Sequence, residues 1–150
     1  MKYSTTYVPP ILTVDAVIFQ LNGTELEVLL TQRQEEPFKG EWALPGGYNP
    51  SGQTTLEALS AIVRRKVGLD LDAQLPYIEQ LYTFDTVARD PRGHAVSVTY
   101  MGCGRAIELS GGSQNAEFFP VDRLPGLAYD HEKIIEYARD RLGAKLTSTN

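Results

Sequence analysis

The sequence predicts an α+β fold in which helices pack on a mixed β-sheet. Two observations lead to this prediction. Several stretches rich in β-branched and aromatic residues have the composition of strands, and two stretches carry apolar residues at helical spacing. These elements follow one another as strands, helix, strands and helix, an order typical of a layered mixed-sheet sandwich. The length of 150 residues suits one domain.

The first strands are expected to form a hairpin. Ile11–Gln20 and Glu25–Arg33 are both strongly apolar, and Asn22-Gly23 between them is a turn signal. A polar loop follows over Gln34–Glu41, and a short apolar run, Trp42–Leu44, is stopped by Pro45, Gly46 and Gly47. Further strands are predicted at Pro76–Val87, His94–Gly102 and Asn115–Pro120.

Two helices are expected. The first runs from about Thr54 to Val67 and ends at Gly68. Its apolar residues share one face; they are Leu56, Leu59, Val63 and Val67. The second runs from about Asp130, as its cap, to Leu142. Its apolar stripe comprises Ile134, Ile135, Ala138 and Leu142. The tail from about residue 143, ending in Thr147–Asn150, has the composition of a linker.

Composition narrows the classes of function. Apolar residues make up 42% and charged residues 22%, values typical of a globular protein. The net charge of −5 disfavours broad electrostatic binding to nucleic acid through these residues. One cysteine, Cys103, excludes an internal disulfide. No apolar run approaches a membrane span, and Met1–Pro10 has no signal-peptide core, so we expect no membrane partner and a cytoplasmic location.

The stretch Leu44–Leu71 carries the chemistry. It resembles the Nudix box, a loop–helix–loop that in hydrolases holds divalent metal ions against a diphosphate. The family pattern is Gly, five residues, Glu, seven residues, Arg-Glu-apolar, one residue, Glu-Glu, one residue, Gly-apolar. When the pattern is anchored on Gly68, its architectural positions fit; they are Gly47, Val63, Gly68 and Leu69.

The chemical positions of the box differ from the pattern. Gln53 stands at the first Glu, Ala61-Ile62 at Arg-Glu, and Arg65-Lys66 at Glu-Glu. Residues 62, 65 and 66 share one helix face, because they are three and four positions apart. Mg²⁺ requires oxygen ligands, and Arg and Lys cannot bind a cation. The degenerate box therefore predicts the loss of two-metal hydrolysis, with no catalytic residue and no metal ligand within it.

The flanks resemble the ADP-ribose-type Nudix proteins. The lead-in comprises Arg33, Pro37–Gly40 and Trp42–Gly47, and a second signature comprises Asp90–Gly93 with His94–Tyr100. The resemblance covers about Ile11 to Leu142 and implies a Nudix fold, a mixed β-sheet sandwiched between helices.

Within this superfamily the chain is most similar to the N-terminal sensor domain of the NrtR family, Nudix-related transcriptional regulators of NAD metabolism. The resemblance implies a domain that recognises ADP-ribose or a related nucleotide, followed by a C-terminal winged helix-turn-helix that binds DNA. Residues 1–150 hold a single Nudix-like domain and no such DNA-binding half. A natural single domain and the N-terminal part of a longer regulator both fit this sequence.

The resemblance also implies which side chains bind the ligand. Arg33, at a strand end, suits a diphosphate, and Arg65 and Lys66 would meet the diphosphate where active members place metal ions. Phe38 and Phe118 could stack on adenine, although burial in the core is the preferred interpretation of Phe118. The full set of ligand-binding candidates is Arg33, Phe38, Lys39, Gly46, Gly47, Arg65, Lys66, Arg89, Arg92 and Phe118.

The favoured function is a non-hydrolytic sensor of ADP-ribose or a close NAD-derived nucleotide, with no required cofactor. The alternative is an active ADP-ribose pyrophosphatase that needs Mg²⁺ and takes its metal ligands from outside the box. Its candidate ligands are Glu35, Glu36, Glu79 and Glu117. A third interpretation is a protein-interaction domain with a vestigial cleft.

A homodimer is also expected. ADP-ribose-type relatives form two-fold dimers, and the N-terminal segment here is rich in residues suited to docking on a partner. These residues are Tyr3, Tyr7, Pro9 and Pro10.

Overall fold

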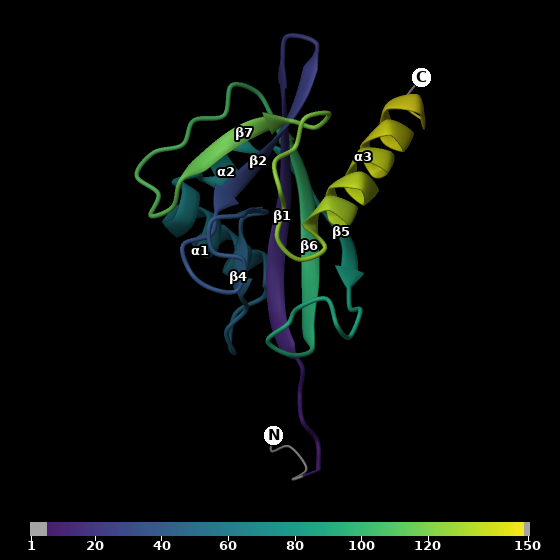
Figure 1. Cartoon of the computed structure of the whole chain (residues 1–150). Helices are drawn as coiled ribbons and strands as arrows, with labels where there is room; N and C mark the ends of the chain where they lie inside the picture. Colours follow the sequence, from purple (N-terminus) through teal and green to yellow (C-terminus); the bar gives the residue numbers. More distant parts are fainter. Residues whose placement is uncertain (1–5, 149–150) are drawn as a thin grey trace.

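The computed structural model describes residues 6–148, with side chains up to residue 145. A seven-stranded mixed sheet forms the middle layer, with helix α1 on one side and helix α3 on the other (Figure 1). This arrangement confirms the predicted α+β fold with a sheet sandwiched between helices. The strands are β1 (Ile11–Asn22), β2 (Glu25–Gln32), β3 (Trp42–Ala43), β4 (Gly46–Tyr48), β5 (Tyr77–Phe84), β6 (Ala95–Gly104) and β7 (Ala116–Pro120). The helices are α1 (Thr55–Val67), α2 (Leu71–Gln74) and α3 (His131–Ser148).

Strand β1 organises the sheet. It lies parallel to β6 from Ile11 to Gln20 and antiparallel to its neighbours on the other edge. On that edge β4 pairs with the first part of β1, around Asp15, whereas β2 pairs with the end of β1 beyond Phe19. The predicted hairpin between β1 and β2 is confirmed, and Gly23 in its turn has a φ of 66°, which glycine adopts without strain.

Helix α1 begins and ends as the sequence predicts. Thr54 caps it through a reciprocal pair of hydrogen bonds with Glu57, and Gly68 ends it with a left-handed φ of 69°. The predicted apolar face is wrong at Leu56, which is 43% exposed. The helix instead buries a face displaced toward the sheet, formed by Ala58, Leu59, Ile62, Val63 and Val67.

Two apolar clusters hold the layers together, one on each face of the sheet. Alternate residues of β1 divide between them: Val14, Ala16 and Ile18 pack against α1, whereas Val17 and Phe19 pack on the α3 side. The stripe predicted for α3 is confirmed, because Ile134, Ile135 and Ala138 are fully buried and Leu142 packs against the same cluster.

Three features differ from the expectations. Gly46 and Gly47, expected to stop the short apolar run before them, form a strand of their own, β4. A side chain at position 46 would overlap Asp15 and the Val14 carbonyl. The carboxylate of Asp130, expected to cap α3, accepts two hydrogen bonds from Arg89. Helix α3 also continues to Ser148, so the segment expected to be a linker from about residue 143 is helical.

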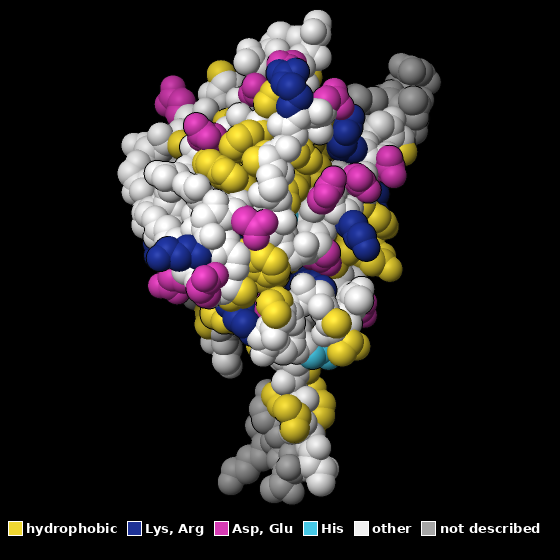
Figure 2. Space-filling view, viewed as in Figure 1, with side chains coloured by type: hydrophobic (Ala, Val, Ile, Leu, Met, Phe, Trp, Pro, Cys, Tyr) yellow, Lys and Arg dark blue, Asp and Glu magenta, His cyan; other side chains and the backbone are white. Residues whose placement is uncertain are grey.

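The visible surface shows no concentration of one charge. On the face in Figure 2, acidic and basic side chains are interspersed. Among the described residues, no helix is long and apolar enough to cross a membrane. Of the N-terminal residues expected to dock on a partner, Tyr3 lies outside the described range, and the Tyr7 side chain is 53% exposed.

Candidate ligand-binding site

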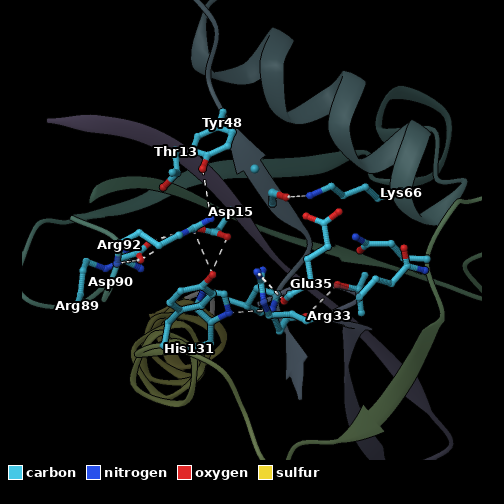
Figure 3. Close-up of a pocket in the computed structure, with 18 of the residues that line it drawn as sticks. Thr13, Asp15, Arg33, Glu35, Tyr48, Lys66, Arg89, Asp90, Arg92 and His131 are labelled. Atoms are coloured by element: carbon cyan, nitrogen blue, oxygen red, sulfur yellow. Dashed lines mark hydrogen bonds and ion pairs between the residues drawn. The ribbon is translucent and has the colours of Figure 1, made fainter. Parts of the chain in front are cut away.

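A cavity of about 400 Å³ lies where the partner of β1 changes from β4 to β2. Strands contribute its floor, α1 contributes one wall, and the start of α3 contributes another (Figure 3). Its polar lining residues include Asp15, Arg33, Glu35, Tyr48, Arg65, Lys66, Arg89, Asp90, Arg92, Tyr129 and His131.

Lys66 brings a fixed cation from α1 into this cavity. Its Nζ donates a hydrogen bond of 2.6 Å to the carbonyl oxygen of Gly46. A side chain on Gly47 would lie 3.4 Å from the same Nζ, so the glycines leave room for the ammonium group. Burial, with the nearby charge of Arg65, lowers the pKa of Lys66, whereas Asp15 partly opposes this shift.

Arg33 follows β2 and holds the adjoining loop in place. Its Nε donates to the carbonyl of Pro37 at 2.7 Å, and its Nη2 donates to the carbonyl of Glu35 at 3.3 Å. The guanidinium carbon lies 5.2 Å from the centre of the Tyr129 ring, within the range of a cation–π contact. Loop conformation and the position of this cation are therefore coupled.

Arg92 forms the third cationic position, in a network with Asp90. Three donors of Arg92, including its backbone N–H, reach the Asp90 carboxylate at 2.8–3.1 Å. Arg92 also donates to the hydroxyls of Tyr48 and Tyr129, both at 3.2 Å. The hydrogen bonds to Asp90 raise the pKa of Arg92. For Asp90, burial opposes ionisation, but the bonds to Arg92 lower its pKa overall.

Arg89 lines the cavity, but its guanidinium is already paired with the carboxylate of Asp130. Its Nε and Nη2 donate to both oxygens of Asp130, at 2.9 and 2.7 Å, and its side chain is 5% exposed. Burial disfavours the charge, yet the pair with Asp130 raises the pKa of Arg89 overall. This geometry makes Arg89 a link between the loop before β6 and the start of α3.

Asp15 and His131 form a buried polar corner of the cavity. Asp15 Oδ2 accepts a 2.6 Å hydrogen bond from Ser97, and His131 Nδ1 accepts a 2.9 Å bond from the backbone N–H of Leu44. Burial lowers the pKa of His131, with Asp15 opposing the shift, which favours a neutral imidazole. The two side chains enter the cavity from β1 and α3 (Figure 3).

The structure brings together most, but not all, of the candidates named from the sequence. Those that line the cavity are Arg33, Gly46, Gly47, Arg65, Lys66, Arg89 and Arg92. Phe38 and Lys39 lie in the adjoining loop, where Phe38 packs edge-on against Tyr129 at 4.8 Å. Phe118 packs against the cluster on the α1 side of the sheet.

Sequence reasoning missed the polar corner and the tyrosines. Asp15 interrupts an otherwise apolar strand in the sequence ILTVDAVIFQ, and such a buried acid is a usable signal of a site. His131 and Tyr129 carry no comparable pattern, because they reach the cavity through the chain path before α3. The φ of 55° at Tyr129 is visible only in the structure.

The residues present do not fit the divalent cation that a Nudix box implies. Within α1, Ile62 is buried in the core and Lys66 directs its ammonium to Gly46. Among the described residues, no group of three or more His, Cys, Asp or Glu side chains could hold a metal ion. Of the ligands considered outside the box, Glu35 lines the cavity, but Glu79 pairs with Lys145 at 3.2 Å and Glu117 is exposed on β7.

A cavity lined by arginine and lysine side chains lies on a mixed sheet packed between helices, and comparison with known proteins identifies the class of protein that this arrangement defines. The NUDIX domain family model matches residues 9–138. The chain belongs to the Nudix family.

Two characterised relatives point to different activities. The chain is 35% identical over 147 residues to the ADP-ribose pyrophosphatase of Methanocaldococcus jannaschii, covering 95% of this chain and 82% of that protein. It is also homologous to the ADPR responsive transcriptional repressor NtrR of Acinetobacter baylyi, with 33% identity over 148 residues. That match covers 95% of this chain but 58% of the repressor, so the chain spans little more than half of its length.

Among solved structures, the NUDIX domain of Shewanella oneidensis NrtR complexed with ADP ribose is similar. Its TM-score is 0.81 at 34% identity, with 93% of this chain and 94% of that chain covered. A MutT/nudix family protein from Enterococcus faecalis gives a TM-score of 0.83 at 28% identity, covering 95% and 66% of the two chains. These neighbours confirm the predicted Nudix fold and the resemblance to the NrtR sensor domain.

Proposed function

We propose that this domain binds ADP-ribose or a closely related NAD-derived nucleotide without hydrolysing it. The observation that carries the proposal is the 2.6 Å contact between Lys66 Nζ and the Gly46 carbonyl oxygen. It places a covalently attached cation beside β4, on the helix face where an active box presents carboxylates for metal ions. A resident ammonium and a divalent ion would repel one another, so the cavity is suited to a ligand's anion.

The other cations support the same ligand. Arg33, Arg65, Lys66 and Arg92 all line the cavity. A diphosphate carries about two negative charges, and charge-assisted hydrogen bonds to it contribute roughly 1.5–3 kcal/mol each. Arg92 is already paired with Asp90, which leaves Arg33, Arg65 and Lys66 to offset the charge of a diphosphate without metal. In this proposal no cofactor is required.

The proposed role is that of an effector domain in a cytoplasmic transcriptional regulator of NAD metabolism. Support comes from the homologous Acinetobacter repressor and from the Shewanella domain whose structure contains ADP ribose. Any contact with DNA would belong to a winged helix-turn-helix outside residues 1–150, since the net charge here is −5. Regulation would require different nucleotide affinities in the DNA-binding and released states.

A second candidate is metal-dependent hydrolysis of ADP-ribose. It is favoured by the 35% identity to the Methanocaldococcus pyrophosphatase, of which the chain covers 82%. The side chains at the box positions oppose it, because Arg65 and Lys66 cannot bind Mg²⁺.

Calorimetric titration of the protein with ADP-ribose, in EDTA and in Mg²⁺, separates the two candidates. The sensor predicts similar affinities in both buffers and weaker binding as salt rises. With stoichiometric protein and millimolar Mg²⁺ or Mn²⁺, ADP-ribose should survive overnight. Protein-dependent release of AMP would establish the hydrolase instead, and absence of binding in both buffers would leave a protein-interaction domain.

We further propose that the protein acts as a homodimer, since a symmetric arrangement would let nucleotide binding alter the spacing of two attached DNA-binding modules. Light scattering at tens of micromolar protein tests this. A mass equal to the 16.6 kDa monomer would contradict it.

A further inference from the structure

The polar corner formed by Asp15 and His131 has a different chemistry from the cationic side of the cavity. The two side chains are 10% and 5% exposed, so a polar group that enters the corner is largely removed from water. A carboxylate repels phosphate oxygens. The corner therefore suits a neutral, hydroxylated part of a ligand rather than its diphosphate.

The hydrogen bonds already made fix what each side chain can still offer. Asp15 uses Oδ2 to accept from Ser97, which leaves Oδ1 as an acceptor. His131 uses Nδ1 to accept from the N–H of Leu44, so a neutral ring carries its proton on Nε2 and can donate from there. The corner thus presents one acceptor and one donor.

These two atoms face one another without forming a hydrogen bond. Asp15 Oδ1 and His131 Nε2 are 3.9 Å apart, too far for a direct bond. An oxygen atom at about 2.8 Å from each would complete both interactions. A hydroxyl fits this position because it can donate to the carboxylate and accept from the imidazole at the same time.

We propose that Asp15 and His131 bind a hydroxyl of the second ribose of ADP-ribose, the one without adenine, and so select it over nucleotides that lack this sugar. The inference rests on the function proposed above. The second ribose is assigned because the corner is buried, whereas Tyr48, which lines another part of the cavity, is 58% exposed and leaves room for a base.

Two ligands of equal diphosphate charge test the proposal. ADP-ribose is compared with the methyl ester of ADP, in which a methyl group replaces the second ribose. The measured quantity is the ratio of their dissociation constants in EDTA, obtained by calorimetry. The unmodified protein should prefer ADP-ribose, and Asp15→Asn should reduce that preference about tenfold, because a neutral amide oxygen accepts a hydrogen bond from the hydroxyl more weakly than a carboxylate does.

A matched control separates hydrogen bonding from charge. Glu35→Gln removes a carboxylate from the same cavity, so it should change both affinities by a similar factor and leave their ratio unaltered. His131→Asn is the second test variant: its amide oxygen can still accept from Leu44, but the Nε2 donor is gone. It should reduce the preference about fivefold, as expected for a neutral hydrogen bond.

Each outcome is decisive. If Asp15→Asn does not fold, His131→Asn decides by the same ratio. Equal losses for both ligands, or a preference unchanged in the variants, would overturn the assignment while leaving nucleotide sensing intact. If the unmodified protein binds the methyl ester but does not prefer ADP-ribose, the assignment fails alone. If it binds neither ligand, the proposed function fails as well.

Discussion

Replacing Lys66 by methionine tests whether a fixed cation has taken over the electrostatic role of a metal ion. Lys66→Met keeps most of the apolar stem and removes the ammonium that lies 2.6 Å from the Gly46 carbonyl. The ammonium is partly buried, so its bond to a phosphate oxygen is screened less than a surface contact. A charge-assisted hydrogen bond contributes roughly 1.5–3 kcal/mol, which corresponds to about 10- to 150-fold in affinity.

The assay is titration with ADP-ribose in EDTA, and the neighbouring residue supplies the control. Arg65 lines the same cavity but is exposed, so Arg65→Met should weaken binding by no more than about 1 kcal/mol, roughly fivefold. Lys66→Met binding as tightly as the parent would refute the reasoning. So would a parent protein that binds ADP-ribose only with Mg²⁺.

The reverse change tests the same reasoning from the other direction. The double substitution Arg65→Glu, Lys66→Glu restores two carboxylates of the family pattern. It should weaken metal-free binding at least tenfold, about 1.4 kcal/mol, and Mg²⁺ should recover part of the loss. No recovery would indicate that the remaining cavity cannot accommodate the ion.

Three further predictions concern stability. Because burial lowers the pKa of His131, the unfolded chain takes up a proton that the folded chain excludes, so stability should fall as the pH drops below the ordinary value of 6.5. Melting at pH 7.5 and 5.5 should show a smaller loss in His131→Asn. Asp130→Ala leaves the buried Arg89 unpaired and should lower the free energy of unfolding in urea by roughly 3 kcal/mol; a loss below 1 kcal/mol would contradict this. Gly46→Ala should destabilise by about 1–3 kcal/mol through overlap, whereas Gly143→Ala, with nothing within 4 Å, should stabilise α3 by about 0.5–1 kcal/mol. The opposite order of these two glycine variants would be inconsistent with the packing described.

The secondary-structure elements that depend on turn or capping residues in their own segment were predictable from the sequence. The β1–β2 hairpin depends on Asn22-Gly23, and α1 depends on the cap at Thr54 and on Gly68, so neighbouring residues determine them. The exposure of Leu56 was not predictable from spacing, since it depends on how α1 is rotated against the sheet. Gly46 was expected from the sequence to stop the apolar run before it. In the structure it leaves room for the Asp15 side chain, a long-range contact that the local sequence does not contain.

The candidate site also has a part that was predictable from the sequence and a part that was not. The cations came from positions in a family pattern, and most of them line the cavity. The polar corner arises from long-range pairing that no local pattern contains. Asp15 is positioned by β1, Ser97 by the parallel strand β6, and His131 by the start of α3, more than a hundred residues beyond Asp15 in the sequence.

Helix α3 has a mechanical consequence because it begins at His131, inside the cavity, and continues without interruption to Ser148. Its 18 residues extend about 27 Å at 1.5 Å per residue. A tilt of about 5° at the cavity end would therefore move the far end by roughly 2 Å. Because the helix is continuous, a small change in its direction at His131 would be magnified along its length and would be largest at Ser148.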